Sequence, residues 1–538
     1  MRVAILGGTG VFGSRLAALL VRDGHEVFVA ARTLGRAKEV AARLDARALH
    51  FDRDGDLSPL WAVTPEAVVD AAGPFHAYGD DPFRLVRACI ARGIYYLDLA
   101  DDPDFCAGIA ALDAEAKAAG VFALSGVSSV PGLSSAVVAT LAAGMEHIDE
   151  IDMAILPGNR APRGISVIGA ILDRTGAPFR FWQGDAWEMR RGWSDARLYR
   201  LAPGLFRAGY LLEVPDNRLF PGYFKASSVS FRAGLELWPM NVGLAVLSRL
   251  RSMLGFTPPR WMVRVAHGLA RLLSPFGSDR GGMIVRISGR RDGAPVAAEW
   301  RLVAEAGDGP FVPAVAARAI LAGARDIPTG ARPALAELPL AAFEAAMADL
   351  AVATEREEHE TPPLFPTFLG QTFRSLPEAV QQSHDWAGCM RLSGRATIVR
   401  GPGVIVRIIA TIFGFPPAGE DVAVTVTKLK NRDGEVWLRA FGDRKFRSRL
   451  RLRRNEMTES FGPFEFTLAL AVHNGTLVFP VTAGRLGPVP IPKALLPLSF
   501  AVEREEGGRF HFDVDLHAPL GLGRIVHYRG WLIVGLLH

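Results

Sequence analysis

The chain has 538 residues, of which 49% are hydrophobic and 22% are charged, and this balance is typical of packed globular domains. A chain of this length is expected to hold about two to four domains. The net charge of +5 is too small to favour a nucleic-acid partner. Three cysteines without a Cys-x-x-Cys or Cys/His cluster predict neither a disulfide scaffold nor a metal site. No signal peptide precedes the first apolar run, so we expect a cytoplasmic protein.

The first thirteen residues, MRVAILGGTGVFG, predict a strand, a glycine turn and the start of a helix. We interpret Gly8 as the residue that makes the tight turn and Gly10 as the one that lets the backbone approach a pyrophosphate. Gly13 would let the helix pack closely on the strand. The free N–H groups and the dipole at the helix start would hold the phosphate charge. The alternative is an ordinary glycine turn without a ligand.

Residues 27–31 predict a second buried strand, which ends at Arg32. A domain that binds NAD usually carries an acidic residue here, which accepts a hydrogen bond from the ribose 2′-hydroxyl. A guanidinium suits a 2′-phosphate instead, because it forms paired charge-assisted bonds with phosphate oxygens. The sequence therefore predicts NADP rather than NAD, unless Arg32 is merely a solvated residue at the start of the next helix.

Strand-like runs alternate with helical patterns through about residue 130, which predicts βαβ units and a parallel Rossmann-type sheet. We expect its strands at residues 3–6, 27–31, 48–52, 67–71, 95–99 and 121–124, and a helix over residues 103–119. The nucleotide crevice of such a sheet lies at the carboxyl ends of its first and fourth strands. The predicted cofactor-binding residues are Gly7, Gly8, Thr9, Gly10, Val11, Phe12, Gly13, Arg32, Asp52, Ala71, Ala72, Gly73 and Pro74.

Two candidate catalytic residues, His76 and Tyr78, follow the fourth strand in the run AAGPFHAYG and would face a substrate there. Histidine is the side chain most easily poised for proton transfer near neutral pH. The alternative is that His76 is an ordinary loop residue. Residues 1–352 hold only three lysines, so we do not expect a lysine as the acid or base.

The run AAGPFHAYGDDPFRLVRACIARGIYYLDLADDPDF, followed by SGVSSVPGLSS, resembles the saccharopine dehydrogenase-like NADP-binding family. The resemblance is carried by a G-P-F-x-x-Y-G segment, Cys89 in a helix, a Y-x-D-L segment and a later Val-Pro, together with the glycines of the first turn. It implies a nicotinamide-dependent oxidoreductase but specifies no substrate. Many members carry T-G-E after the Y-x-D-L-x segment. Here Asp101 and Asp102 keep a carboxylate without the Thr-Gly, which makes Asp101 the third candidate catalytic residue.

Residues 136–352 mix strand-like runs with helices, which predicts an α+β domain for substrate binding or dimerisation. Runs on either side of residues 291–293 predict a hairpin. Residues 240–256 and 261–276 are apolar and carry several arginines, but no run of eighteen uncharged apolar residues predicts a spanning helix. Such segments lie on a membrane surface or form buried or dimerising helices, and the second interpretation is the commoner case.

The charged and then proline-rich residues 353–366 predict an exposed linker. Short alternating runs and turns at residues 432–434, 474–475 and 507–508 then predict a mainly antiparallel β domain over residues 367–538. This region resembles an uncharacterised domain that accompanies such reductases in some bacteria. Its phenylalanines would line an apolar interior or form an ordinary core. Arginines at 447, 449, 451 and 453 share one strand face, which would meet an anion or lie in solvent beside glutamates.

Together these features predict an α/β protein with a Rossmann-type NADP domain over residues 1–135, the α+β domain, the linker and the β domain. The predicted function is hydride transfer to or from a C=N, C=O or C=C group of an unidentified small molecule, with a lipid-like substrate among the candidates. The alternative is a non-catalytic protein that binds a nucleotide or a lipid. Peripheral contact with the inner membrane and a homodimer are further expectations.

Overall fold

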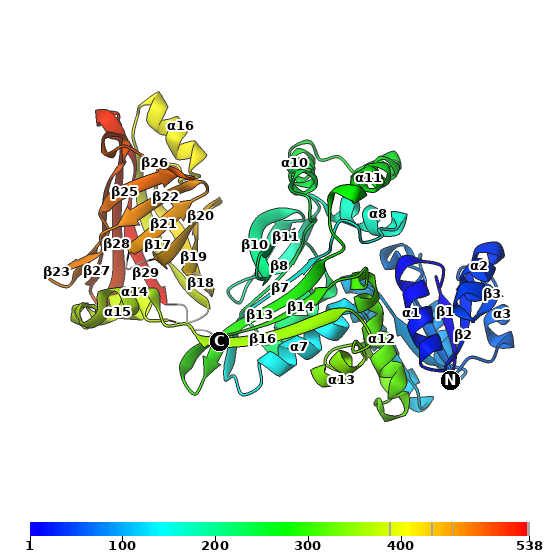
Figure 1. The fold of residues 1–538 in the computed structure, drawn as a ribbon. Helices are drawn as coiled ribbons and strands as arrows, with labels where there is room; N and C mark the ends of the chain where they lie inside the picture. Colours follow the sequence, from blue (N-terminus) through cyan, green and yellow to red (C-terminus); the bar gives the residue numbers. More distant parts are fainter. Residues whose placement is uncertain (387–388, 432–433, 454–455, 535–538) are drawn as a thin grey trace. The chain divides into compact units, whose positions relative to one another are not determined.

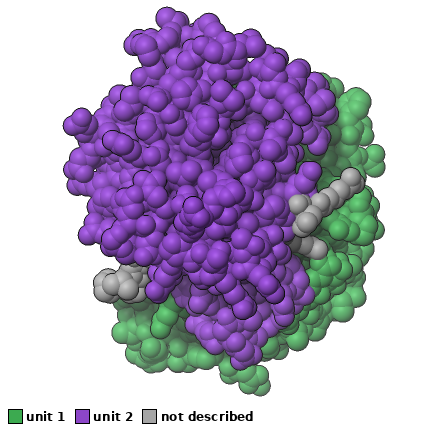
Figure 2. All heavy atoms as spheres, turned by 90° about the vertical axis from the view of Figure 1, so that its left-hand side faces the viewer, with its two compact units in different colours: residues 1–143, 151–287, 298–357 green, residues 144–150, 288–297, 358–538 purple. Residues whose placement is uncertain are grey.

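The computed structural model describes residues 1–386, 389–431, 434–453 and 456–534. The chain divides into two compact units, drawn as ribbons in Figure 1 and with all heavy atoms in Figure 2. Unit 1 comprises residues 1–143, 151–287 and 298–357, and unit 2 comprises residues 144–150, 288–297 and 358–538. The Rossmann region and most of the α+β region therefore lie in one compact unit.

A parallel sheet of seven strands forms the N-terminal part of unit 1, in the order β15-β6-β5-β4-β1-β2-β3. Figure 1 labels β1, β2 and β3 of this sheet. Its strands are Arg2–Leu6 (β1), Glu26–Ala31 (β2), Arg47–His50 (β3), Ala67–Asp70 (β4), Tyr95–Asp98 (β5), Phe122–Ser125 (β6) and Gly330–Pro333 (β15). The first six confirm the predicted Rossmann-type alternation, with bounds that differ by one or two residues. β15 comes from far along the chain and pairs with β6, and no local pattern predicts that pairing.

Helices cover this sheet, as expected for a parallel sheet whose central strands are apolar on both faces. They are Val11–Arg22 (α1), Leu34–Leu44 (α2), Ser58–Ala62 (α3), Arg84–Ile90 (α4), Pro103–Gly108 (α5), Asp113–Ala118 (α6), Ser134–Leu141 (α7) and Val312–Ala322 (α12). The helical pattern predicted over residues 103–119 is confirmed, with a 3-10 turn over Ile109–Leu112 that separates α5 from α6. Gly108, a poor helix former, lies at that junction.

The α+β region is built on a second seven-stranded sheet, in the order β10-β11-β12-β7-β13-β14-β16. Its strands, with the separate pair β8 and β9, are His147–Leu156 (β7), Pro178–Trp182 (β8), Trp187–Arg191 (β9), Ser194–Ala202 (β10), Leu205–Leu211 (β11), Ser228–Ala233 (β12), Gly281–Arg291 (β13), Ala294–Ala304 (β14) and Val352–Glu360 (β16). The predicted hairpin is confirmed, since Asp292 and Gly293, both at positive φ, join the neighbouring strands β13 and β14.

The helices of this region are Ile165–Arg174 (α8), Pro215–Phe224 (α9), Trp238–Leu254 (α10), Arg260–Leu273 (α11) and Leu340–Ala345 (α13). The helices expected within residues 240–276 are present, but their burial within the chain is wrong, and a dimerising role stays a prediction. α10 buries only Asn241 and Ser248, and α11 buries no residue, because the apolar residues of both helices recur on an outward face. Within the described part of the chain, no helix has the length and apolarity needed to cross a bilayer.

The predicted linker over residues 353–366 begins as a strand, since residues up to Glu360 form β16 at the end of the second sheet. Its alternating charges suit an edge strand, which must avoid pairing with other chains. Arg301 of β14 supports this edge through ion pairs with Glu355 at 3.0 Å and Glu357 at 2.7 Å.

Unit 2 is built on a curved sheet of thirteen strands, in the order β23-β24-β27-β28-β29-β17-β18-β19-β20-β21-β22-β25-β26 (Figure 1). The strands are Cys389–Arg400 (β17), Gly419–Asn431 (β18), Gly434–Phe441 (β19), Arg444–Arg453 (β20), Glu456–Phe461 (β21), Phe464–Leu468 (β22), Ala471–His473 (β23), Thr476–Val478 (β24), Val481–Leu486 (β25), Val489–Pro490 (β26), Leu498–Glu506 (β27), Arg509–Ala518 (β28) and Gly523–Val534 (β29). The pairs along this order are antiparallel, which confirms the predicted architecture.

Short helices accompany this sheet: Leu364–Leu369 (α14), Glu378–His384 (α15) and Val404–Ile412 (α16). The turns predicted at residues 474–475 and 507–508 join β23 to β24 and β27 to β28. The turn predicted at residues 432–434 lies largely outside the described residues. In β20 the side chains of Phe446, Ser448 and Leu450 are buried while the arginines between them point the other way, as their period of two predicts.

Candidate cofactor and active site

The connection between β1 and α1 is a tight turn in which close backbone contacts leave no room for a side chain at Gly7 or beside it at Gly13. Gly7 has φ +67°, and a Cβ there would lie 2.6 Å from the carbonyl oxygen of Ala71. A Cβ on Gly13 would lie 2.4 Å from the carbonyl oxygen of Gly7. Real Cβ atoms do not approach so closely, so both positions require glycine. The tight turn is therefore made by Gly7, whereas Gly8 packs against Ile5 and Val29.

The N-terminus of α1 opens onto this turn. Gly10 is the N-cap residue, and its nitrogen donates to the carbonyl oxygen of Gly7 at 2.8 Å. No side chain caps α1 and no acidic residue lies in its first turn. The first N–H groups of the helix thus lack partners within it and attract negative charge. These features fit the pyrophosphate of a dinucleotide, which is bound by main-chain N–H groups where glycine allows close approach.

The predicted cofactor-binding residues that follow β4, β2 and β3 differ in what they contact. The backbone of Ala71 and Ala72, which follow β4, packs directly under Gly7. Arg32, which follows β2, is exposed and makes no hydrogen bond or ion pair with the described residues. Asp52, which follows β3, accepts a hydrogen bond from the nitrogen of Asp54 at 3.2 Å and so shapes its own turn.

Tyr78 points into a buried polar network rather than into solvent. Asp70, at the end of β4, is fully buried and accepts from the Tyr78 hydroxyl at 3.2 Å and from Nε of Arg53 at 3.2 Å. The Arg53 guanidinium also lies over the Tyr78 ring. Burial and the neighbouring Asp70 raise the pKa of Tyr78 above its ordinary value, so its hydroxyl stays protonated and donates inward. His76, by contrast, is exposed.

Asp98, at the end of β5, joins this strand end to the end of the neighbouring strand β6. Its carboxylate accepts from the nitrogen of Ala100 at 3.0 Å, from the Ser125 hydroxyl at 2.8 Å and from the nitrogen of Gly126 at 2.8 Å. Burial raises the pKa of Asp98 to about 7 despite these bonds. Every bond runs to backbone or to a neighbouring strand, which is the behaviour of a structural residue.

The second sheet region contributes two side chains to the end of β5. Arg174, the last residue of α8, donates Nη1 to the Asp101 carboxylate at 3.1 Å and Nη2 to the Asp101 carbonyl oxygen at 2.8 Å. Glu213, between β11 and α9, is half-buried, and burial raises its pKa while the charge of Arg174 lowers it. Its carboxylate makes no hydrogen bond with the residues that the structure describes. Both residues lie far from Asp101 in the sequence, so no motif identifies them.

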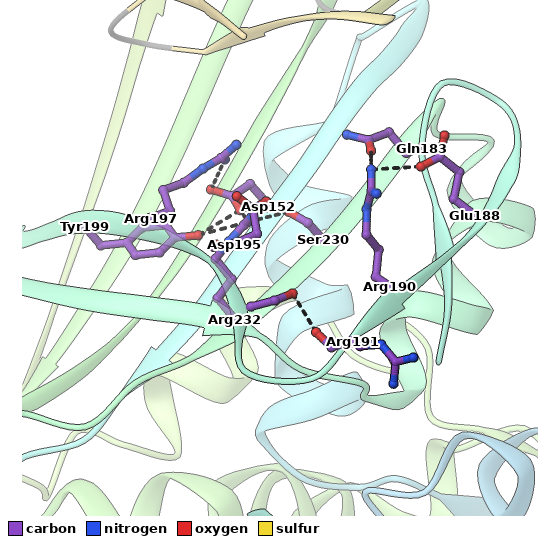
Figure 3. Close-up of polar contacts among 11 residues, drawn as sticks. Asp152, Gln183, Glu188, Arg190, Arg191, Asp195, Arg197, Tyr199, Ser230 and Arg232 are labelled. Carbon is purple, nitrogen blue, oxygen red and sulfur yellow. Dashed lines mark hydrogen bonds and ion pairs between the residues drawn. The ribbon is translucent and has the colours of Figure 1, made fainter. Parts of the chain in front are cut away.

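A separate ion network crosses the second sheet (Figure 3). Asp152 of β7 is buried and accepts from Tyr199 at 2.9 Å, Ser230 at 2.8 Å and Arg232 at 2.7 Å, and it pairs with Arg197 at 2.7 Å. The surrounding guanidinium groups hold the pKa of Asp152 at about 2, against the opposing effect of burial. The network joins β7, β10 and β12, and its saturated contacts indicate a structural role.

Comparison with known protein families gives a match in the N-terminal part of the chain and another in its C-terminal part. Residues 3–124 match the family described as the saccharopine dehydrogenase NADP binding domain, and residues 376–532 match a domain of unknown function (DUF4166). Over 82 residues the chain is 39% identical to a 3-diazoavenalumate denitrifying reductase from a Streptomyces species. That match spans 15% of this chain and 26% of the relative, so it covers about a quarter of the relative's length.

Solved structures resemble this chain at low sequence identity. Apo saccharopine dehydrogenase (L-Glu forming) from Saccharomyces cerevisiae has a TM-score of 0.50 and 13% identity, over 66% of this chain and 99% of that one. Homospermidine synthase from Legionella pneumophila, solved in complex with NAD, has a TM-score of 0.46 and 13% identity, over 68% of this chain and 92% of that one.

The fold and the glycine turn define a Rossmann-type protein that binds a nicotinamide dinucleotide. Residues 3–124 match the saccharopine dehydrogenase NADP binding domain, and the chain shares its fold with a saccharopine dehydrogenase over 66% of its length.

Proposed function

We propose that the protein is an NADP(H)-dependent oxidoreductase that acts on a C=N, C=O or C=C group of a small molecule. The bound cofactor supplies or accepts the hydride. The observation that carries the proposal is the main-chain turn at Gly7 and Gly13, where close backbone contacts leave room only for glycine beside the open N-terminus of α1. This arrangement binds phosphate without a side chain.

We assign the choice of NADP over NAD to Arg32. Its guanidinium follows β2, where the adenosine ribose lies in Rossmann domains, and it is exposed without a partner among the described residues. Arg36 and Lys38, exposed on α2, add positive charge nearby. A free guanidinium forms paired bonds with a 2′-phosphate, whereas it offers no acceptor to a ribose 2′-hydroxyl.

We propose that proton exchange with the substrate takes place beside the end of β5. Glu213 is a half-buried carboxyl with a pKa raised by burial and no hydrogen-bond partner among the described residues, which suits a general acid or base. Arg174 positions Asp101 and the loop around it. His76 and Asp101 keep their predicted roles as groups that contact the substrate, and Tyr78 acts through Asp70 as a positioning residue.

The test is a fluorescence titration with NADPH and NADH, followed by a panel of imines, carbonyl compounds and enoyl compounds. We expect NADPH to bind at least about tenfold more tightly than NADH, and Arg32→Ala to remove most of this difference. Lys38→Ala, which keeps Arg32, is the matched control. Equal affinities that Arg32→Ala leaves unchanged would reject the role of Arg32. No response to either coenzyme in fluorescence or melting temperature would reject the oxidoreductase itself.

Tight NADPH binding without turnover of any compound in the panel would instead support a non-catalytic nucleotide-binding protein. Lipid-like enoyl and carbonyl compounds belong in the panel, because unit 1 exposes the apolar faces of α10 and α11.

A further inference from the structure

Unit 2 holds a cavity of about 360 Å³ on the inner side of its curved sheet. This volume lies within the roughly 300–1,000 Å³ of small-molecule sites. Residues of α16 line it together with side chains of the sheet, and most of the lining is apolar, including Ile409, Phe461, Phe464, Phe466 and Phe479. Other phenylalanines of this unit do not line it, since Phe510 and Phe512 lie in the core and Phe500 is 62% exposed.

The polar groups of the lining are few and their charges are compensated. Arg439 pairs with Glu459 at 3.2 Å and donates to the Ser448 hydroxyl at 2.6 Å. Glu503 accepts a hydrogen bond from His384 at 2.5 Å, and its charge interacts with that of the buried Lys428. Tyr528 is 7% exposed, and its hydroxyl makes no hydrogen bond with the described residues. A hydroxyl in the lining of a cavity that has no protein partner is available for a hydrogen bond to a ligand.

We propose that this cavity binds one uncharged lipid, with an apolar body against the phenylalanines and a single oxygen that bonds to Tyr528. A charged head group would have no unpaired counter-charge there and would lose its hydration. α16 offers such a ligand an apolar route from solvent into the cavity. Ile409 lines the cavity, and Val404, Ile405 and Ile408 of the same helix are exposed. The proposal concerns unit 2 alone and does not depend on the oxidoreductase activity.

The test uses the full chain and the neutral apolar fluorophore N-phenyl-1-naphthylamine. We expect saturable fluorescence that dodecanol displaces at least about tenfold more effectively than dodecanoate or dodecyltrimethylammonium, because of the cost of burying a charge. Displacement by either charged compound at the concentration needed for dodecanol would overturn the uncharged class. The absence of saturable fluorescence would overturn the site.

Variants locate the binding within the cavity. Ala501→Trp fills the cavity from β27 and should weaken fluorophore binding by about tenfold or more, since the added ring occupies the ligand's volume. Phe500→Ala, its exposed neighbour, is the matched control and should change affinity by less than about twofold. If Ala501→Trp shows no melting transition and therefore does not fold, Val481→Phe serves as the second variant that fills the cavity. Equal affinity in a folded filling variant and in Phe500→Ala overturns the assignment.

Tyr528→Phe tests the oxygen contact separately. It should weaken dodecanol binding by about threefold to tenfold, as the loss of one neutral hydrogen bond predicts, and leave the fluorophore affinity unchanged. Unchanged dodecanol binding would remove Tyr528 from the site.

The outward faces of α10 and α11 carry a second inference independently. Large apolar side chains recur there at helical spacing and are 44% to 74% exposed: Trp238, Val242, Val246, Leu250, Met253 and Leu254 on α10, and Trp261, Val265, Leu269 and Leu272 on α11. Residues 237–278 contain no acidic residue. Arg249, Arg260, Arg264 and Arg271 are exposed and make no ion pair with described residues.

We infer that this face rests on an anionic lipid surface. Tryptophan and aliphatic residues on one face, with arginine beside them and no carboxylate, are typical of helices that lie in the membrane interface. Arginines of this kind gain energy from anionic head groups. A second copy of the chain on this face would bring two sets of unpaired arginines together, which like-charge repulsion disfavours.

Flotation with vesicles of phosphatidylcholine, with and without phosphatidylglycerol, tests the inference. We expect flotation only with the anionic vesicles and less of it at high salt, because salt screens the arginines. The double variant Trp238→Ser with Trp261→Ser should bind at least about tenfold less, whereas the control Phe206→Ser, exposed on β11, should bind as the wild type does. Failure of the wild type to float, or a dimer that the double variant dissociates, overturns the inference.

Discussion

Nη1 of Arg174 lies 3.1 Å from Oδ2 of Asp101, so the end of α8 is tied to the loop that follows β5. The same guanidinium donates to the Asp101 carbonyl oxygen, which fixes the backbone as well as the side chain. Asp101 is 49% exposed, so this pair contributes little to stability. Its effect is to hold the loop that follows β5 against the end of α8.

Arg174→Ala should therefore lower kcat/KM by about tenfold to a hundredfold on whichever acceptor the panel identifies, because misplacement of a site by about 1 Å has such an effect. Arg174→Lys restores one of the two bonds and should recover part of the loss. NADPH affinity and melting temperature should stay near the wild-type values. Steady-state kinetics and calorimetry measure these quantities, and an unchanged kcat/KM in Arg174→Ala would contradict the positioning role.

Gly13→Ala should abolish NADPH binding and destabilise the fold. The new methyl group would lie 2.4 Å from the Gly7 carbonyl oxygen, so the helix must move away from the turn, at a cost of about 1–3 kcal/mol. Gly35→Ala in α2 is the matched control, because no atom lies within 4 Å of the new methyl group. It should bind NADPH normally. Chemical denaturation and fluorescence titration distinguish the two variants, and normal NADPH binding by Gly13→Ala would be inconsistent with the proposed cradle.

Tyr78→Phe separates positioning from catalysis. Loss of the hydrogen bond to Asp70 should destabilise the protein by about 0.5–1.5 kcal/mol and change kcat by less than about tenfold. A decrease in kcat of about a hundredfold or more, with an altered pH profile, would show that the hydroxyl takes part in proton transfer. His76→Ala is the parallel variant, and it should affect kcat without changing the melting temperature if His76 contacts the substrate.

Asp152→Asn should destabilise the protein by about 3–5 kcal/mol, because it leaves the buried guanidinium groups of the network without their carboxylate. The pKa of Asp152 is about 2 in the folded protein, below its ordinary value of 3.8. Its contribution to stability is thus complete above about pH 4 and is lost as the pH falls towards 2.

Melting temperatures measured across this acid range should fall more steeply for the wild type than for Asp152→Asn. Asp185→Asn makes the same chemical change at an exposed position and should follow the wild type. Parallel acid profiles for all three proteins would show that Asp152 does not titrate as inferred.

The sequence by itself determined the cofactor half of unit 1 and the architecture of unit 2. An apolar run, closely spaced glycines and leucines at helical spacing act within about twenty residues, so local chemistry is enough to define β1, the turn and α1. Alternating runs with glycine turns likewise define antiparallel strands such as β27 and β28.

Only the tertiary structure decided which side chains meet at the site. Arg53 reaches Asp70, Arg174 reaches Asp101, and β15 joins the Rossmann sheet from beyond the second sheet. The composition of α10 and α11 could not show which face is exposed. These relationships depend on packing between segments that are distant along the chain. Such packing produces no local sequence pattern, so periodicity and motif spacing cannot predict it.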